Sequence, residues 1–262
     1  MMTATIFLHP SLAPLEGGVN FRDMGGYLAA HGRRIKRGKL FRSGALDRLT
    51  DKDLSYLQDV PIKNILDYRD ADEVSNKPDV LWDAVRYINL PANPLSTEVN
   101  ANLEKLTSEA LESFDANAFM LELYRRLPFS NHAYQLLSTL LQSGEEGAIV
   151  QHCAVGKDRT GVGSALVLFA LGADEATVME DYLLTETTLA PFRSQMLDYL
   201  SIKLNEKALG QFSHVLSARE EFLVTALDAI KEKYSTVDRW LEQEYGLNMQ
   251  VRSQLQQQFL EP

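Results

Sequence analysis

The chain of 262 residues has a single cysteine, Cys153, so it forms no internal disulfide. This favours a reducing compartment, and we expect a cytoplasmic protein. Residues 1–14 lack both the basic start and the apolar stretch of a secretory signal peptide, although secretion by another route stays open. With no second cysteine to resolve an oxidised sulfur, we expect sensitivity to peroxide.

Other absences narrow the class of protein. No apolar run approaches the roughly 20 residues of a membrane span. Basic residues number 26 against 36 acidic ones, and the net charge of −10 argues against a nucleic-acid partner. The five histidines form no H-E-x-x-H pattern, so we expect no metal site and no cofactor. Hydrophobic content of 45% is ordinary for a soluble globular protein, and we expect one domain over residues 1–262.

Residues 148–164 combine a short apolar run, a loop that begins with Cys153, and an apolar segment with spaced glycines. Ala148–Val150 is too short for a helix, so we expect a buried strand. From Thr160 the sequence is apolar almost all round as far as Gly172, which indicates a buried helix. The loop therefore lies at a helix N-terminus, where unpaired N–H groups and the helix dipole favour an anion.

Five residues separate Cys153 from Arg159, enough to turn the peptide N–H groups inward as an anion nest. Gly156 supplies the backbone freedom for this curl, and Arg159 can grip two oxygens of a phosphate. The residues that we expect to bind phosphate are Ala154, Val155, Gly156, Lys157, Asp158 and Arg159.

The same surroundings lower the pKa of a cysteine, and here the nest, the Thr160 hydroxyl and the charges of Lys157 and Arg159 act together. We therefore predict a thiolate nucleophile that attacks a phosphate monoester in line, forms phosphocysteine and is released by water. The nest and Arg159 stabilise the transferring group, so the reaction needs no metal.

Four other functions of this loop are less consistent with its residues. An inert buried thiol is the usual fate of a lone cysteine, but it leaves the spacing of Gly156, Arg159 and Thr160 unexplained. A nucleotide-binding P-loop would need Gly at position 151, where the chain has Gln151. A rhodanese-type sulfurtransferase fits the arginine poorly, and a catalytically dead phosphate-binding adaptor would usually have lost Cys153 or Arg159.

The loop HCAVGKDRTG resembles that of the bacterial atypical, PtpB/LipA-like branch of the Cys-based protein tyrosine phosphatase superfamily, whose members carry HC-x-x-GKDRTG. Four further segments resemble this branch: Asn20–Tyr27, Leu40–Gly44, Ile65–Arg69 and Trp240–Asn248. Because they are spread along the sequence, the resemblance extends over nearly the whole chain. The resemblance implies hydrolysis of phosphotyrosine, with phosphoserine, phosphothreonine and phosphoinositides as further substrates. A phosphatase dedicated to phosphoinositides or another small phosphate metabolite is the alternative.

A tyrosinate leaving group needs a proton, and two aspartates compete for the role of general acid. Asp158 lies in the loop itself; its other role would be structural, as an acceptor of N–H bonds or as a counter-charge for neighbouring cations. Asp67 follows a predicted strand, and its other role would be a salt bridge with Arg69. Lys157 either reaches a second phosphate on the substrate or helps to neutralise the first. His152 would hydrogen-bond the Cys153 region and so support the thiolate.

The NFRDMGGY segment offers Arg22 and Asp23, and the following segment offers Arg42. By resemblance these residues line the pocket, or an Arg–Asp pair among them braces the loop.

Alternation of strands and helices favours an α/β fold with a mostly parallel central sheet flanked by helices. We expect strands at 62–68, 85–90 and 149–150, the last of them central. Capping patterns predict helices from Thr50 to about 58, from Ser217-x-x-Glu220 to about 233, from Thr236 to 246, and after Asn248. We expect several helices within residues 92–145. The resemblance implies that this region, together with 185–212, forms a helical lid over the active site. The alternative is that these helices only pack against the core.

Overall fold

The computed structural model describes residues 9–95 and 107–262 and contains one five-stranded sheet. Its order is β1-β2-β5-β3-β4, with β1–β2 antiparallel and all other pairs parallel. The strands are β1 (Arg22–Asp23), β2 (Leu40–Ser43), β3 (Ile62–Asp67), β4 (Arg86–Asn89) and β5 (Ala148–His152). The predicted α/β class is confirmed, and the strand that leads to Cys153 is central as expected.

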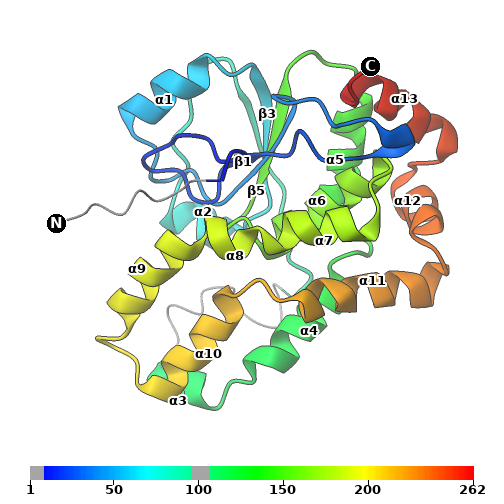
Figure 1. Cartoon of the computed structure of the whole chain (residues 1–262). Coiled ribbons are helices and arrows are strands. Elements are labelled where there is room, and N and C mark those ends of the chain that lie inside the picture. The colour runs from blue at the N-terminus through cyan, green and yellow to red at the C-terminus, as the bar shows by residue number, and fades with distance from the viewer. Residues whose placement is uncertain (1–8, 96–106) are drawn as a thin grey trace.

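Helices lie on both sides of this sheet (Figure 1). They are the 3₁₀ turn η1 (Ala30–Gly32), α1 (Asp51–Gln58), α2 (Ala71–Asn76), α3 (Ser108–Glu112), α4 (Ala116–Arg126), α5 (His132–Gln142), α6 (Asp158–Ala170), α7 (Glu175–Leu183), α8 (Thr185–Thr188), α9 (Ala190–Leu200), α10 (Glu206–Leu216), α11 (Glu220–Tyr234), α12 (Val237–Tyr245) and α13 (Met249–Phe259). None of these helices in the described ranges is long and apolar enough to cross a membrane.

Alternation along the strands divides the core between the two faces of the sheet. Ile149 and Leu66 face the larger cluster, which contains α5, α6, α11 and α12. Their neighbours Val150 and Ile65 face a smaller cluster against α1. Because the central strand is buried on both faces, the loop at its carboxyl end starts from a rigid position.

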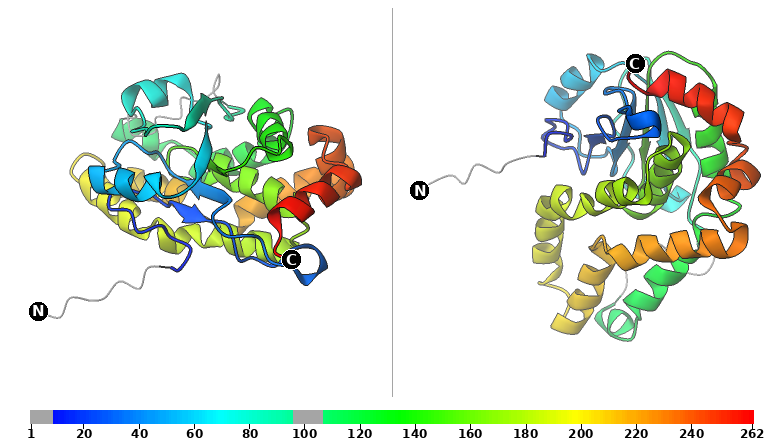
Figure 2. Two further views of the ribbon diagram at one scale, coloured as in Figure 1. Left: turned by 90° about the horizontal axis from the view of Figure 1, so that it is seen from above. Right: turned by 45° about the vertical axis from the view of Figure 1, so that its right-hand side comes forward.

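A third, small apolar cluster lies below the sheet, where α3, α9 and α10 form a separate helical tier (Figures 1 and 2). Its buried members are Leu200, Phe212 and Leu216, and Val155 of the Cys153 loop packs against them. The tier is thus in direct contact with the loop that the sequence singles out.

The capping predictions hold at three of four helices. Thr50, Thr236 and Asn248 each accept a hydrogen bond from the first turn of the helix that follows. The prediction for Ser217 was wrong: α11 begins after Arg219, whose side chain does not cap it. The Ser217 hydroxyl instead donates to the Ser213 carbonyl 2.9 Å away, because α10 continues to Leu216 and leaves that oxygen within reach.

Candidate active site

The Cys153 loop joins the carboxyl end of β5 to the N-terminus of α6, which begins at Asp158. Gly156 has the expected left-handed backbone, with φ of +69°. A Cβ atom at this position would lie 2.5 Å from the Ser43 carbonyl, so both the dihedral and the close approach require glycine. The curl predicted from the sequence is therefore built into the backbone.

Three carbonyls of the loop are held outward by hydrogen bonds. Ala154 O accepts from the Ala45 N–H at 3.0 Å. Asn20 Nδ2 donates to Val155 O at 3.1 Å and to Gly156 O at 3.0 Å, and Arg42 Nη2 donates to Gly156 O at 2.8 Å. In a planar trans peptide the N–H of the next residue points opposite to the carbonyl. Fixing the carbonyls outward therefore turns the following N–H groups inward, as an anion nest needs.

The side chains that hold these carbonyls belong to one buried network. Arg42 and Arg22 both form ion pairs with Asp181 of α7, and the Arg22–Asp181 pair spans 3.5 Å. Arg22 also donates to Asn20, whose amide oxygen accepts from Thr188 at 2.6 Å. The sequence hypothesis of an Arg–Asp pair among Arg22, Asp23 and Arg42 was wrong about the aspartate. Both arginines pair with Asp181, and Asp23 instead accepts from the N–H groups of neighbouring turns.

Cys153 is 1% exposed, and its pKa lies below the ordinary thiol value. Burial alone would raise that pKa, but the charge of Arg159 and hydrogen bonding from Thr160 outweigh the burial. The Thr160 hydroxyl is buried and makes no hydrogen bond of ordinary geometry with a described residue, so the sulfur is the polar group left for it. The site therefore favours a thiolate.

Arg159 is held by a residue that the sequence did not suggest. Glu73 of α2 accepts from Arg159 Nη1 at 2.5 Å and from Nη2 at 2.9 Å. Burial alone would lower the pKa of Arg159. The ion pair with Glu73 has the larger effect, so the pKa is raised and the guanidinium stays charged. The pKa of Glu73 is lowered because Arg159 outweighs the burial of the carboxyl.

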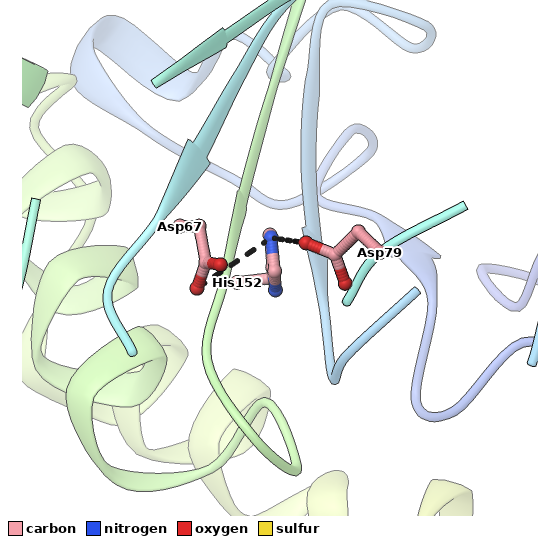
Figure 3. Close-up of side chains that lie close together, drawn as sticks. All are labelled: Asp67, Asp79 and His152. Carbon is pink, nitrogen blue, oxygen red and sulfur yellow. Dashed lines mark ion pairs between the residues drawn. The ribbon is translucent and has the colours of Figure 1, made fainter. Parts of the chain in front are cut away.

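Beneath the loop, His152 lies between two carboxylates (Figure 3). Its Nε2 is 3.2 Å from Asp79 Oδ2 and 3.8 Å from Asp67 Oδ1, while Nδ1 lies 3.4 Å from the Cys153 carbonyl. Burial lowers the pKa of His152, but the two aspartates outweigh it and the pKa is raised. The expected contact with the Cys153 backbone is present.

These three side chains are close enough together to hold a metal ion. However, Arg69 Nη2 lies 2.8 Å from Asp67 Oδ2 and 2.7 Å from Asp79 Oδ2. A guanidinium already supplies the positive charge at this place, so the cluster is a charge network around His152 rather than a built cation site.

The two candidate general acids lie in different surroundings. The Asp67 side chain is fully buried and accepts from Arg69 and from Tyr87 Oη at 2.7 Å, so the salt bridge considered from the sequence is present. The Asp158 side chain is 18% exposed and accepts from Tyr124 Oη at 2.7 Å and from Lys157 Nζ at 2.5 Å.

Lys157 points away from solvent. Its side chain is fully buried, and Nζ lies 5.4 Å from the centre of the Phe222 ring on α11, as well as bonding Asp158. This position suits a counter-charge within the loop and does not present the ammonium to a distant group of a substrate.

Within residues 9–95 and 107–262, cavities border the loop on two sides. One, on the side of α4 and α10, is lined by Asp158 and Arg159 together with apolar side chains such as Phe119 and Val215. The other, on the side of α2 and α9, is lined by Ala154 and Val155 and has a volume of about 620 Å³ including the part open to solvent.

An α/β fold with a cysteine-led loop between its central strand and a helix is typical of Cys-based phosphatases. A family model described as "Tyrosine phosphatase family" matches residues 13–261. The chain therefore belongs to the tyrosine phosphatase family and is a protein tyrosine phosphatase.

Three relatives are each 28% identical to the chain. One is the triple specificity protein phosphatase PtpB of Mycobacterium tuberculosis, aligned over 258 residues, 87% of this chain and 91% of the relative. The second is a candidate tyrosine-protein phosphatase of Cupriavidus necator, aligned over 223 residues, 85% of this chain and 80% of the relative. The third is a tyrosine-protein phosphatase of Nostoc commune, aligned over 157 residues, 60% of this chain and 51% of the relative.

Proposed function

We propose that the chain is a metal-independent phosphomonoesterase that hydrolyses phosphotyrosine through a phosphocysteine intermediate. The observation that carries the proposal is the geometry of the loop between β5 and α6: Cys153 begins it, surrounding residues hold its carbonyls by hydrogen bonds, and Glu73 holds Arg159 in place. The lowered thiol pKa of Cys153 agrees with this geometry. These are the features that make a thiolate nucleophilic and stabilise a transferring phosphoryl group.

In the first step the Cys153 sulfur attacks phosphorus in line, the S–P bond forms, and the bond from phosphorus to the tyrosine oxygen breaks. The Asp158 carboxyl gives its proton to the leaving oxygen. In the second step the Asp158 carboxylate takes a proton from water as that water attacks phosphorus. The S–P bond then breaks, which releases inorganic phosphate and restores the thiolate. Arg159 and the inward N–H groups of residues 155–157 stabilise the charge on the three equatorial oxygens in both steps.

Asp158 is preferred to Asp67 as general acid because of access. The Asp158 side chain is partly exposed and borders the same cavity as Arg159. Asp67 is fully buried, is paired with Arg69, and has a lowered pKa because His152 and Arg69 outweigh its burial, so it holds a proton poorly. We propose that Asp67 serves to position His152.

For the substrate range, the similarity to the triple specificity phosphatase of Mycobacterium tuberculosis supports activity beyond phosphotyrosine, with phosphoserine, phosphothreonine or phosphoinositides as candidates. Because the Lys157 side chain is buried, the hypothesis that it contacts a second phosphate of the substrate has no support. We therefore rank a phosphatase dedicated to phosphoinositides or another small phosphate metabolite second.

We also propose that the tier of α3, α9 and α10 acts as the lid of a single phosphatase domain. Its apolar cluster packs on Val155 of the loop. By contrast α5, which lies within the region 92–145 considered as a lid, packs in the main core through Leu137 and Leu141. The proposed lid thus contains fewer helices than the one drawn from the sequence, and residues 96–106 of the region 92–145 lie outside the described residues.

The test is a comparison of kcat/KM across phosphotyrosine, phosphoserine and phosphothreonine peptides and inositol phosphates, for the wild type and Cys153→Ser. We expect phosphotyrosine to be hydrolysed best, vanadate to inhibit competitively, EDTA to have no effect, and the variant to be inactive. Full activity of Cys153→Ser would end the proposal, and exclusive turnover of inositol phosphates would replace it with the second candidate.

A further inference from the structure

The cavity beside Ala154 and Val155 continues along α9. A second cavity adjoins it, since Arg48, Lys77 and Phe192 line both. We call the two together the α9 groove. One end touches the loop that would hold phosphate, and the other reaches Tyr199 near the end of α9.

The two walls of the α9 groove differ in character. On α9, Phe192, Met196 and Tyr199 follow one another at spacings of four and three residues, so they form an apolar stripe on one face of the helix. Tyr199 is 56% exposed, and Lys203 lies over its ring and donates to its hydroxyl. The other wall carries two exposed cations, Arg48 and Lys77, in a chain whose net charge is −10.

Arg48 is set up to receive a carboxylate. Its guanidinium carbon lies over the Phe192 ring, 5.1 Å from the ring centre, so the ring attracts the cation. A cation–π contact does not use the N–H donors, which are therefore available for a two-point bond to a carboxylate. Of the other charged residues that line the loop-side cavity, Glu73 is already paired with Arg159, and Arg69 with Asp67 and Asp79. Asp47, which is partly buried, also lines this cavity.

The length of the α9 groove suits a peptide. From Phe192 to Tyr199 the helix rises about 10 Å, which an extended chain covers with about three residues. An apolar stripe opposite cations matches a strand of alternating acidic and apolar side chains better than it matches a compact, fully polar inositol headgroup.

From these contacts we propose that the α9 groove binds the residues that flank the phosphotyrosine of a protein substrate, and that Arg48 selects substrates with Asp or Glu within about three residues of it. The inference rests on the proposed function and deepens it. It assigns the selection of substrates to Arg48, whereas Lys157 serves only as a buried counter-charge within the loop.

The experiment uses three phosphotyrosine peptides that differ only in the flanking residues: Glu on the N-terminal side, Glu on the C-terminal side, or Gln on both. The selectivity ratio is kcat/KM for the better acidic peptide divided by that for the Gln peptide. It is measured for the wild type, Arg48→Ala, Arg48→Glu and Phe192→Ala. Arg239→Ala removes the same charge from an exposed site on α12 and is the matched control. A p-nitrophenyl phosphate assay and an inositol phosphate assay accompany each variant.

We expect the wild type to prefer an acidic peptide about three- to fivefold, as partly exposed ion pairs allow, and less so at high salt. The ratio should fall to about one in Arg48→Ala, below one in Arg48→Glu, and partway in Phe192→Ala, while Arg239→Ala keeps the wild-type ratio. Three results would overturn the inference while the proposed function stands. The wild type could show no preference for the acidic peptides, or Arg48→Ala could keep that preference. Arg48→Ala could also lose kcat/KM only for inositol phosphates. Turnover of p-nitrophenyl phosphate without turnover of any phosphotyrosine peptide would overturn both.

Discussion

Glu73 and Arg159 meet through two parallel contacts, Oε2 to Nη1 at 2.5 Å and Oε1 to Nη2 at 2.9 Å. The pair joins α2 to the first turn of α6 and is almost completely buried. A guanidinium held at two points cannot rotate freely, so its direction relative to the Cys153 loop is fixed before substrate arrives. This preorganisation is what electrostatic stabilisation of a transition state requires.

Removal of this carboxylate should therefore weaken both the fold and catalysis. We expect Glu73→Ala to lose about 3–5 kcal/mol of unfolding free energy, because it leaves a buried arginine unpaired. In Glu73→Gln, which keeps one acceptor, we expect a smaller loss of stability and a fall in kcat/KM. Urea unfolding and p-nitrophenyl phosphate kinetics measure the two effects. Wild-type kcat/KM in both variants would show that Glu73 does not orient Arg159.

The choice of general acid can be tested with leaving groups of different basicity. Phenolate needs a proton as it leaves, whereas p-nitrophenolate needs little help, so loss of the acid affects the first ester more. We expect Asp158→Asn to slow phenyl phosphate about 10²-fold or more beyond its effect on p-nitrophenyl phosphate. Asp67→Asn should slow both esters to a similar degree. The reverse pattern would transfer the role to Asp67.

Asn20 should control the ionisation of Cys153 although it does not contact the sulfur. Its amide holds the Val155 and Gly156 carbonyls outward, at 3.1 and 3.0 Å. In Asn20→Ala we expect the N–H groups to turn away from the loop centre, the thiol pKa to rise, and vanadate to bind more weakly. Asn205→Ala, which removes an exposed helix cap on α10, is the control and should leave the thiol titration unchanged. An unaltered thiol pKa in Asn20→Ala would mean that the nest does not depend on this residue.

Asp181 links stability to pH. Burial raises its pKa, but Arg42 and Arg22 outweigh the burial, so the pKa in the folded state is lower than in the unfolded state. The stability that its charge contributes is present above the unfolded value of about 3.9 and is lost as pH falls from there through the folded value. We expect Asp181→Asn to lose about 3–5 kcal/mol near neutral pH. The variant should also lose less further stability than the wild type as the pH is lowered below 5. Urea unfolding at pH 7, 5 and 4 tests this, and parallel losses in both proteins would contradict it.

Much of this architecture follows from local sequence, because strands, caps and the glycine of the loop are specified by neighbouring residues. Thr50 and Asn248 each accept from a backbone N–H a few positions away, and the positive φ of Gly156 concerns its own backbone; all three were predicted. Glu73 lies 86 residues before Arg159, and Asp181 lies 139 residues after Arg42, so no spacing rule connects them. The Asp70-x-x-Glu73 pattern indicates the start of α2, but the same carboxylate also holds Arg159, and only the tertiary fold reveals this.

Ser217 illustrates the opposite error. Its spacing to Glu220 matches a capping pattern, but its hydroxyl donates to a carbonyl at the end of α10 and does not cap α11. The burial of the Lys157 side chain could not be predicted from local sequence either, because it depends on Phe222 of α11, which lies 65 positions further along the chain.

The most direct test of the account is a titration of the single sulfur. Cys153 is the only cysteine, so thiolate absorbance near 240 nm, with Cys153→Ser subtracted as the blank, reports one group. We predict a transition clearly below the ordinary thiol value of about 8.5, and a higher transition in Thr160→Ala, which loses the hydroxyl facing the sulfur. A wild-type transition at or above the ordinary value would contradict the claim that this loop holds a thiolate.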